Sequence, residues 1–265
     1  MKKWYIVLVT GLLCFALISC DKKDDPEENT PANYAPGEIP GLGEAEGELT
    51  GSPFRLPDGV ELISGINGGA NHDGYWNYPE TYTVSATFTR KDGNIVSRPR
   101  TPQTRSEEVY HYSGSGANYV DLLISMRNTK SSPVTVTFPA ATILCSETGS
   151  CQNGVLLKKV TVTIPGNSDY HLCLAFYCGN ASKSPASGSD VYVLGVVSNA
   201  RPLLDLCERL KNKKINIEEF DRTSYDDFIT YCSQVSELQD ILWKVTDENG
   251  MNDDDINYIR LLPNS

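Results

Sequence analysis

A cysteine and a glutamine far apart in the chain have side chains that could do chemistry. Cys178 ends an apolar stretch just before a polar loop at residues 179–185. Gln239 follows 61 residues later in a helical pattern, on an otherwise apolar face that it shares with Trp243. A buried amide without partners costs about 1–3 kcal/mol. The Gln239 amide is therefore either satisfied by backbone groups or used for another purpose.

The two segments together resemble the thioester domains of Gram-positive surface adhesins. In that family a cysteine follows an aromatic residue, precedes a proline by several positions and bonds to a glutamine in a Gln-x-x-aliphatic-Trp helix. The residues that match these motifs are Tyr177, Cys178, Pro185, Gln239, Leu242 and Trp243.

The resemblance implies an internal thioester. Cys178 Sγ attacks the side-chain carbonyl of Gln239 and expels ammonia, and a partner's lysine amine later displaces the thiolate to form an isopeptide bond. Holding thiol and amide together raises their effective concentration and favours the first step. Tyr177 and Trp243 would shield the bond from water. Each molecule reacts once, so the protein is not an enzyme in the sense of turnover.

Two residues depart from that family, and the sequence leaves other readings of Cys178 open. Leu238 precedes the glutamine where Thr or Ser is usual, and Gly179 follows the cysteine where a bulkier residue is common. Cys178, Gln239 and Trp243 could also be ordinary core residues. The disulfide partners open to Cys178 are Cys173, Cys207 and Cys232.

Four other cysteines are candidates for disulfides. Cys145 and Cys151 flank a Gly-containing turn and could close a small loop. Cys207 and Cys232 fall on two predicted helices, which a bridge would pin together. The envelope beyond the inner membrane is oxidising and permits such bonds.

The sequence lacks the usual patterns of metal and cofactor sites. His72, His111 and His171 are scattered singly, without the spacings of metal ligands. No nucleophile lies near a base along the chain, which argues against a hydrolase. Paired acids in so acidic a chain indicate a solvated face. We therefore expect neither a metal nor a cofactor.

The first residues predict a lipoprotein. Two lysines precede an apolar run at residues 4–18, which is shorter than the roughly 20 residues of a membrane-spanning helix. The run ends in residues 17–20, which resemble a lipobox with Cys20 as the lipidated residue. Residues 21–25 resemble the charged export tag of Bacteroidetes surface lipoproteins. The expected protein loses a signal peptide, residues 1–20, and is lipid-anchored at the outer membrane, exposed on the cell surface.

The net charge argues against nucleic acid as a partner. It is −11 for the whole chain and −13 once Lys2 and Lys3 leave with the signal, and such a surface repels phosphates. The expected partners are the membrane, through the lipid, and a protein or glycan of a host or cell surface. The alternative function is a lipoprotein that binds such a partner non-covalently or is structural.

Composition and periodicity divide the rest of the chain into three parts. Residues 21–59 are rich in Pro, Gly and Glu and predict a disordered stalk. Residues 60–198 contain short alternating segments, which predict an antiparallel β-sandwich. Residues 199–265 predict helices packed on the sandwich, with Pro202 in the first turn and Ser224 and Asn252 as N-caps. The alternating segments are 82–88, 119–126, 134–138, 155–164, 170–177 and 191–197. The fold class is mainly β with a C-terminal helical part (α+β).

Overall fold

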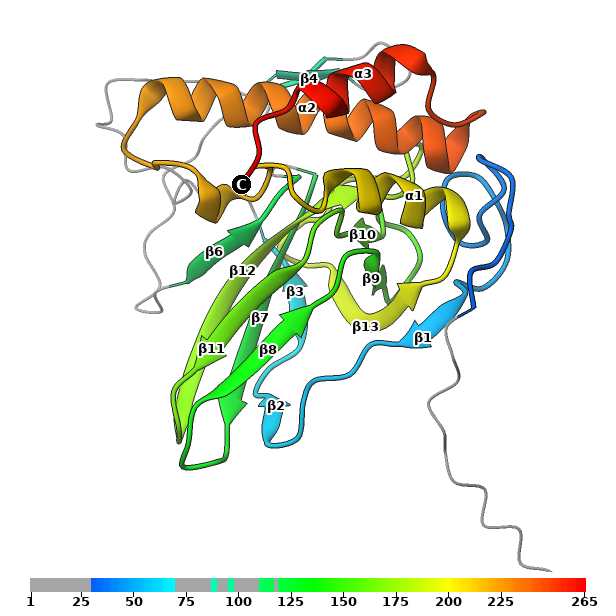
Figure 1. Ribbon diagram of the computed structural model, residues 1–265. Coiled ribbons are helices and arrows are strands. Elements are labelled where there is room, and N and C mark those ends of the chain that lie inside the picture. Colours follow the sequence, from blue (N-terminus) through cyan, green and yellow to red (C-terminus); the bar gives the residue numbers. More distant parts are fainter. Residues whose placement is uncertain (1–29, 70–86, 90–94, 98–109, 117–118) are drawn as a thin grey trace, which may run out of the picture.

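The computed structural model describes residues 30–69, 87–89, 95–97, 110–116 and 119–265 (Figure 1). The predicted signal peptide with Cys20, residues 21–25, His72 and residues 82–86 lie outside these ranges. Among the helices of the described part, none is long and apolar enough to cross a membrane.

Six strands close into an antiparallel barrel. In ring order they are β7, β3, β13, β9, β10 and β12, and β12 pairs again with β7. Their bounds are β3 Ile66–Gly68, β7 Val120–Asn128, β9 Thr142–Ser146, β10 Gly154–Val155, β12 Ser168–Cys178 and β13 Val191–Ser198. The antiparallel, mainly β prediction is confirmed, but the sandwich is wrong. The sheet closes through β3 and β10, which are three and two residues long and too short to show an alternating pattern.

Further strands pair with the barrel or form separate two-stranded sheets. The strand β1 (Gly51–Pro53) pairs with β13, β2 (Val60–Leu62) with β7, and β6 (His111–Gly114) in parallel with β12. The described residues also form two separate two-stranded antiparallel sheets, β4 (Thr87–Thr89) with β5 (Ile95–Ser97) and β8 (Val134–Phe138) with β11 (Val160–Ile164).

The core lies inside the barrel, where β7 and β12 present alternate side chains. Ile124 faces Leu172 and Leu122 faces Leu174 in the cross-strand register, and all four side chains are fully buried. Burial of each such side chain stabilises the fold by about 1.5–3 kcal/mol. This pair of strands fixes β12, and β12 ends at Cys178.

Helices cover one end of the barrel, the upper end in Figure 1. They are α1 (Arg201–Leu210), the short 3₁₀ helix η1 (Ile217–Glu219), α2 (Tyr225–Asp247) and α3 (Asp253–Leu261). The predicted helix starts are confirmed, because Pro202 lies in the first turn of α1 and the side chains of Ser224 and Asn252 cap α2 and α3.

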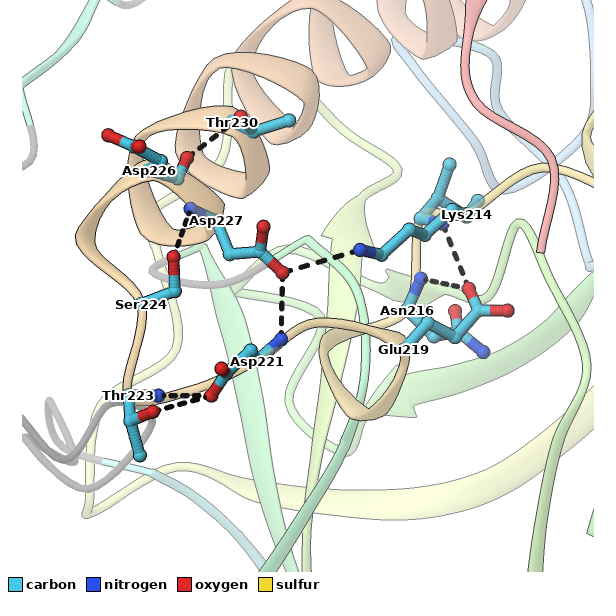
Figure 2. A network of polar contacts seen from close by, with 10 residues as sticks. Lys214, Asn216, Glu219, Asp221, Thr223, Ser224, Asp226, Asp227 and Thr230 are labelled. Atoms are coloured by element: carbon cyan, nitrogen blue, oxygen red, sulfur yellow. Dashed lines mark hydrogen bonds and ion pairs between the residues drawn. The ribbon is translucent and has the colours of Figure 1, made fainter.

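Charged side chains fix the point at which α2 begins (Figure 2). The Asp227 carboxylate accepts hydrogen bonds from the backbone N–H of Asp221 at 2.8 Å and from Lys214 Nζ at 3.3 Å. Just before it, the Glu219 carboxylate accepts from the backbone N–H of Asn216 at 2.9 Å. Because a helix is regular, fixing its start also fixes where Gln239 lies, about four turns further on.

Residues 30–59 are packed against the body of the protein, so the predicted stalk at 21–59 is wrong from residue 30 onward. Ile39 and Leu42 belong to the core, at 1% and 0% exposure. The N–H of Gly37 donates to the carbonyl of Val245 in α2, and that of Gly43 to Gly179 just after β12. The Pro- and Gly-rich composition here serves close backbone contact rather than solvation.

Candidate functional site

The structure brings Cys178 and Gln239 into direct contact. Cys178 is the last residue of β12, Gln239 lies in the middle of α2, and both are 0% exposed. The backbone N–H of Cys178 donates to Gln239 Oε1 at 2.7 Å, and Gln239 Nε2 donates to the Cys178 carbonyl at 2.9 Å. Two elements that are distant in the chain therefore meet at these two residues.

The contact has the form of strand pairing. On one edge of β12, the N–H of Gly179 donates to Asn153 beside β10. On the other edge, β7 begins at Val120, which pairs with Phe176. The N–H and C=O of Cys178 point to this second edge, since successive residues of a strand alternate in direction. The side-chain amide of Gln239 takes the place of one more residue of a neighbouring strand.

The sulfur of Cys178 is held by the turn that follows the strand. Cys178 Sγ lies 3.2 Å from the Asn180 carbonyl, to which the thiol donates, and 3.4 Å from the Asn180 N–H, from which it accepts. The Asn180 side chain fixes this turn, because its Oδ1 accepts from the N–H of Asn153 at 3.0 Å. Asn180 lies in the polar loop at residues 179–185, but its place in the sequence does not predict this role.

The two aromatic residues of the predicted site lie in different places. Trp243, 5% exposed, is one turn beyond Gln239 and packs edge-on against Tyr119, with ring centroids 5.6 Å apart. Tyr177 is fully buried but precedes Cys178 in the strand, so its side chain projects from the opposite face of β12. Burial raises the pKa of the Tyr177 hydroxyl. The structure therefore brings Trp243 close to Gln239 on α2, whereas the Tyr177 side chain points away from that of Cys178, toward Tyr231 of α2 and Tyr258 of α3.

One hydrogen bond of the pair lies where it would stabilise an oxyanion on the Gln239 amide. Charge develops on Oε1 when a nucleophile adds to that carbon, and the Cys178 N–H already donates to Oε1. A backbone donor in this position stabilises an oxyanion. The same hydrogen bonds also satisfy a buried amide, so the geometry suits both an acyl site and a structural contact.

In the described part of the chain no disulfide joins either predicted pair, Cys207 with Cys232 or Cys145 with Cys151. Cys207 faces the barrel, with its Sγ 3.9 Å from the Leu156 carbonyl, whereas Cys232 is only half-buried. Burial raises the pKa of the Cys207 thiol to about 12. A Cys207–Cys232 bridge would require α1 to turn its buried face away from the barrel.

The other predicted pair, Cys145 and Cys151, is likewise unbonded. Cys145 lies in β9, where its sulfur packs beside Gly195 of β13. Cys151 lies 3.8 Å from the hydroxyl of Ser150. Burial raises the pKa of both cysteine thiols.

A serine and a histidine that the sequence did not connect are hydrogen-bonded. Ser125 Oγ lies 2.9 Å from His171 Nδ1, because these residues are direct partners across β7 and β12. Knowledge of the strand register would have predicted the contact. His111 stacks on Tyr170, with ring centroids 4.6 Å apart. Within the described ranges, no group of three or more His, Cys, Asp or Glu side chains could hold a metal ion.

Comparison with known proteins gives no match to a protein-family model, to a curated protein or to a solved structure.

Proposed function

We propose that the chain is a lipid-anchored surface adhesin that captures an amine-bearing partner through an internal thioester between Cys178 and Gln239. The observation that carries the proposal is the 2.7 Å hydrogen bond from the Cys178 N–H to Gln239 Oε1. It joins the two halves of the sequence motif that resembles a thioester domain.

The thioester forms by acyl transfer from nitrogen to sulfur. Cys178 Sγ exchanges its contacts with Asn180 for a bond to Gln239 Cδ, and the Cδ–Nε2 bond breaks. The thiol proton leaves with the amide nitrogen as ammonia, so atoms and charge balance. The Cys178 N–H stabilises the charge on Oε1 during the step.

In the capture step the Cys178 sulfur is the leaving group, whereas in thioester formation it is the nucleophile. A lysine amine of the partner attacks Cδ of Gln239, the bond to Cys178 Sγ breaks, and the thiolate takes up a proton. The product is an isopeptide bond and a free thiol. A thioester is a good acyl donor and an amide a poor one, so capture is durable and occurs once per molecule.

The lipid anchor would place this reaction at the cell surface. The apolar run at 4–18, the lipobox ending in Cys20 and the charged residues 21–25 support an outer-membrane lipoprotein with its domain exposed. The chain's net charge of −11 favours a protein or glycan partner over nucleic acid.

One observation supports a second function. Both polar atoms of the Gln239 side chain are hydrogen-bonded to backbone groups. Oε1 and Nε2 both pair with Cys178 at the end of β12. In this alternative the pair only fastens α2 to the barrel. The lipoprotein then binds a surface protein or glycan without a covalent bond.

Unfolding the purified full-length lipoprotein in methylamine separates the two functions. A thioester reacts as the chain opens, so peptide mapping finds Gln239 as its N-methyl amide. Cys178→Ser serves as the control and keeps the ordinary amide. An unmodified Gln239 in the unfolded wild-type protein would establish the alternative.

A further inference from the structure

A short segment of the N-terminal region closes over the turn that follows Cys178. We call this segment, residues 37–43, the strap. At one end the N–H of Gly37 donates to the Val245 carbonyl at 2.9 Å, and at the other the N–H of Gly43 donates to the Gly179 carbonyl at 2.8 Å. The strap therefore connects α2 and β12, the two elements that carry Gln239 and Cys178.

Asn180 joins the strap to the sulfur of Cys178. Its side-chain Nδ2 donates to the carbonyls of Gly43 at 3.0 Å and Gly41 at 3.3 Å, while its backbone holds Cys178 Sγ. Asn153 Nδ2 adds a hydrogen bond to the Gly41 carbonyl at 3.1 Å. The same turn thus binds the sulfur on one side and the strap on the other.

Leu42 fills the space beside the turn. It is 0% exposed, and its Cδ2 would lie only 2.8 Å from a Cβ placed on Gly179. Gly179 departs from the bulkier residue that is common in the thioester family, and this contact gives the reason. A larger side chain at 179 would displace Leu42 and with it the strap.

The strap is anchored on both sides by contacts that its release would leave in place. Before it, the N–H of Ala32 donates to the Asn199 carbonyl at 2.8 Å and the Ala32 carbonyl accepts from Arg201. After it, Gly51–Pro53 form β1 at the edge of β13. Lifting the strap breaks the hydrogen bonds described above but no strand pairing of the barrel, and local openings of this kind cost less than global unfolding.

We propose that release of the strap, held closed by Asn180, is the step that admits a solute to Cys178. Cys178 and Gln239 are 0% exposed with the strap closed, so neither a thiol reagent nor an amine reaches them. Control of amine capture by the strap rests on the proposed function. Protection of the Cys178 sulfur by the strap does not.

A glycine substitution tests the strap without changing Cys178, Gln239 or Asn180. A Cβ on Gly43 would lie 2.1 Å from the Thr246 carbonyl oxygen, so Gly43→Ala prevents the strap from seating. Gly149 has a similar left-handed backbone, φ +69° against +57°, but nothing within 4 Å of its Cβ position. Gly149→Ala is therefore a control for backbone strain alone.

The measurement is the labelling rate of each cysteine in the native full-length protein, followed by peptide mass. The intact mass of the protein decides the reagent. If it shows a thiol at Cys178, labelling by N-ethylmaleimide is followed. If it shows a thioester, incorporation of methylamine at Gln239 is followed. We expect Gly43→Ala to accelerate modification at least about tenfold, and Gly149→Ala to leave it near the wild-type rate. The strap proposal is therefore tested even if the protein forms no thioester.

Cys207 distinguishes strap release from unfolding, because it lies on α1 and its sulfur is buried against the Leu156 carbonyl. Release predicts that Gly43→Ala exposes the Cys178 site while Cys207 keeps its wild-type protection from N-ethylmaleimide. If Gly43→Ala unfolds the protein, Asn180→Asp is used instead, since a carboxylate cannot donate to the carbonyls of Gly41 and Gly43. An unchanged rate at the Cys178 site in both variants, or a rate that rises only together with Cys207, would overturn the proposal.

Discussion

Gln239 pairs with Cys178 as a residue of a neighbouring strand would, with its Oε1 2.7 Å from the Cys178 nitrogen and its Nε2 2.9 Å from the Cys178 carbonyl oxygen. A side chain of α2 thereby completes the hydrogen bonding at the end of β12. The relationship explains why an amide is tolerated at 0% exposure.

Replacing Gln239 by alanine should destabilise the protein strongly. The change leaves the N–H and C=O of Cys178 buried without these partners, and each such group costs about 1–3 kcal/mol. We expect Gln239→Ala to lower the free energy of unfolding by about 2–5 kcal/mol in urea denaturation. Glu237→Ala, at an exposed position on the same helix, should stay within about 0.5 kcal/mol of wild type. Equal effects of the two changes would contradict the pairing.

The Cys207 thiol should make stability fall at alkaline pH. Its pKa rises from 9.0 to about 12 on folding because of burial, so between these values the unfolded chain has lost a proton that the folded one keeps. Stability contributed by the neutral thiol is present below about pH 9 and is lost as pH rises. Relative to Cys207→Ala, wild type should lose about 1 kcal/mol between pH 8 and pH 10. A difference in unfolding free energy that does not change with pH would show that this thiol is not buried.

Limited proteolysis should leave residues 32–59 joined to the barrel. Ile39 and Leu42 are buried, and β1 pairs with β13, so this part of the backbone is protected in the folded protein. The N-terminal sequence and mass of the resistant core measure the boundary. A core that starts near residue 60 would restore the solvated stalk that composition suggested.

Periodicity predicted the long elements of the fold but not how they close. Strands such as Val134–Phe138 and Ser168–Cys178 show alternation over several residues, and the caps at Ser224 and Asn252 mark helix starts. The barrel depends on β3 and β10, and neither is long enough to give a pattern. Such strands are set by tertiary pairing rather than by local sequence.

For the site, the sequence predicted the partners but not the atoms in contact. The resemblance to thioester domains connected Cys178 to Gln239, and the structure places them together. The motifs did not indicate that the Gln239 amide forms both of its hydrogen bonds with the backbone of Cys178. Nor did they indicate that Asn180 holds the sulfur of Cys178. These contacts depend on which edge of β12 is open, which follows from the strand order alone.

The intact mass of the purified lipoprotein, measured under mild conditions before any amine is added, shows whether the Cys178–Gln239 thioester exists. An internal thioester between Cys178 and Gln239 predicts a wild-type protein lighter by one ammonia than its sequence and lipid require, with the full mass restored in Cys178→Ser. A wild-type protein of full mass would contradict the thioester and leave Gln239 as a structural partner of β12.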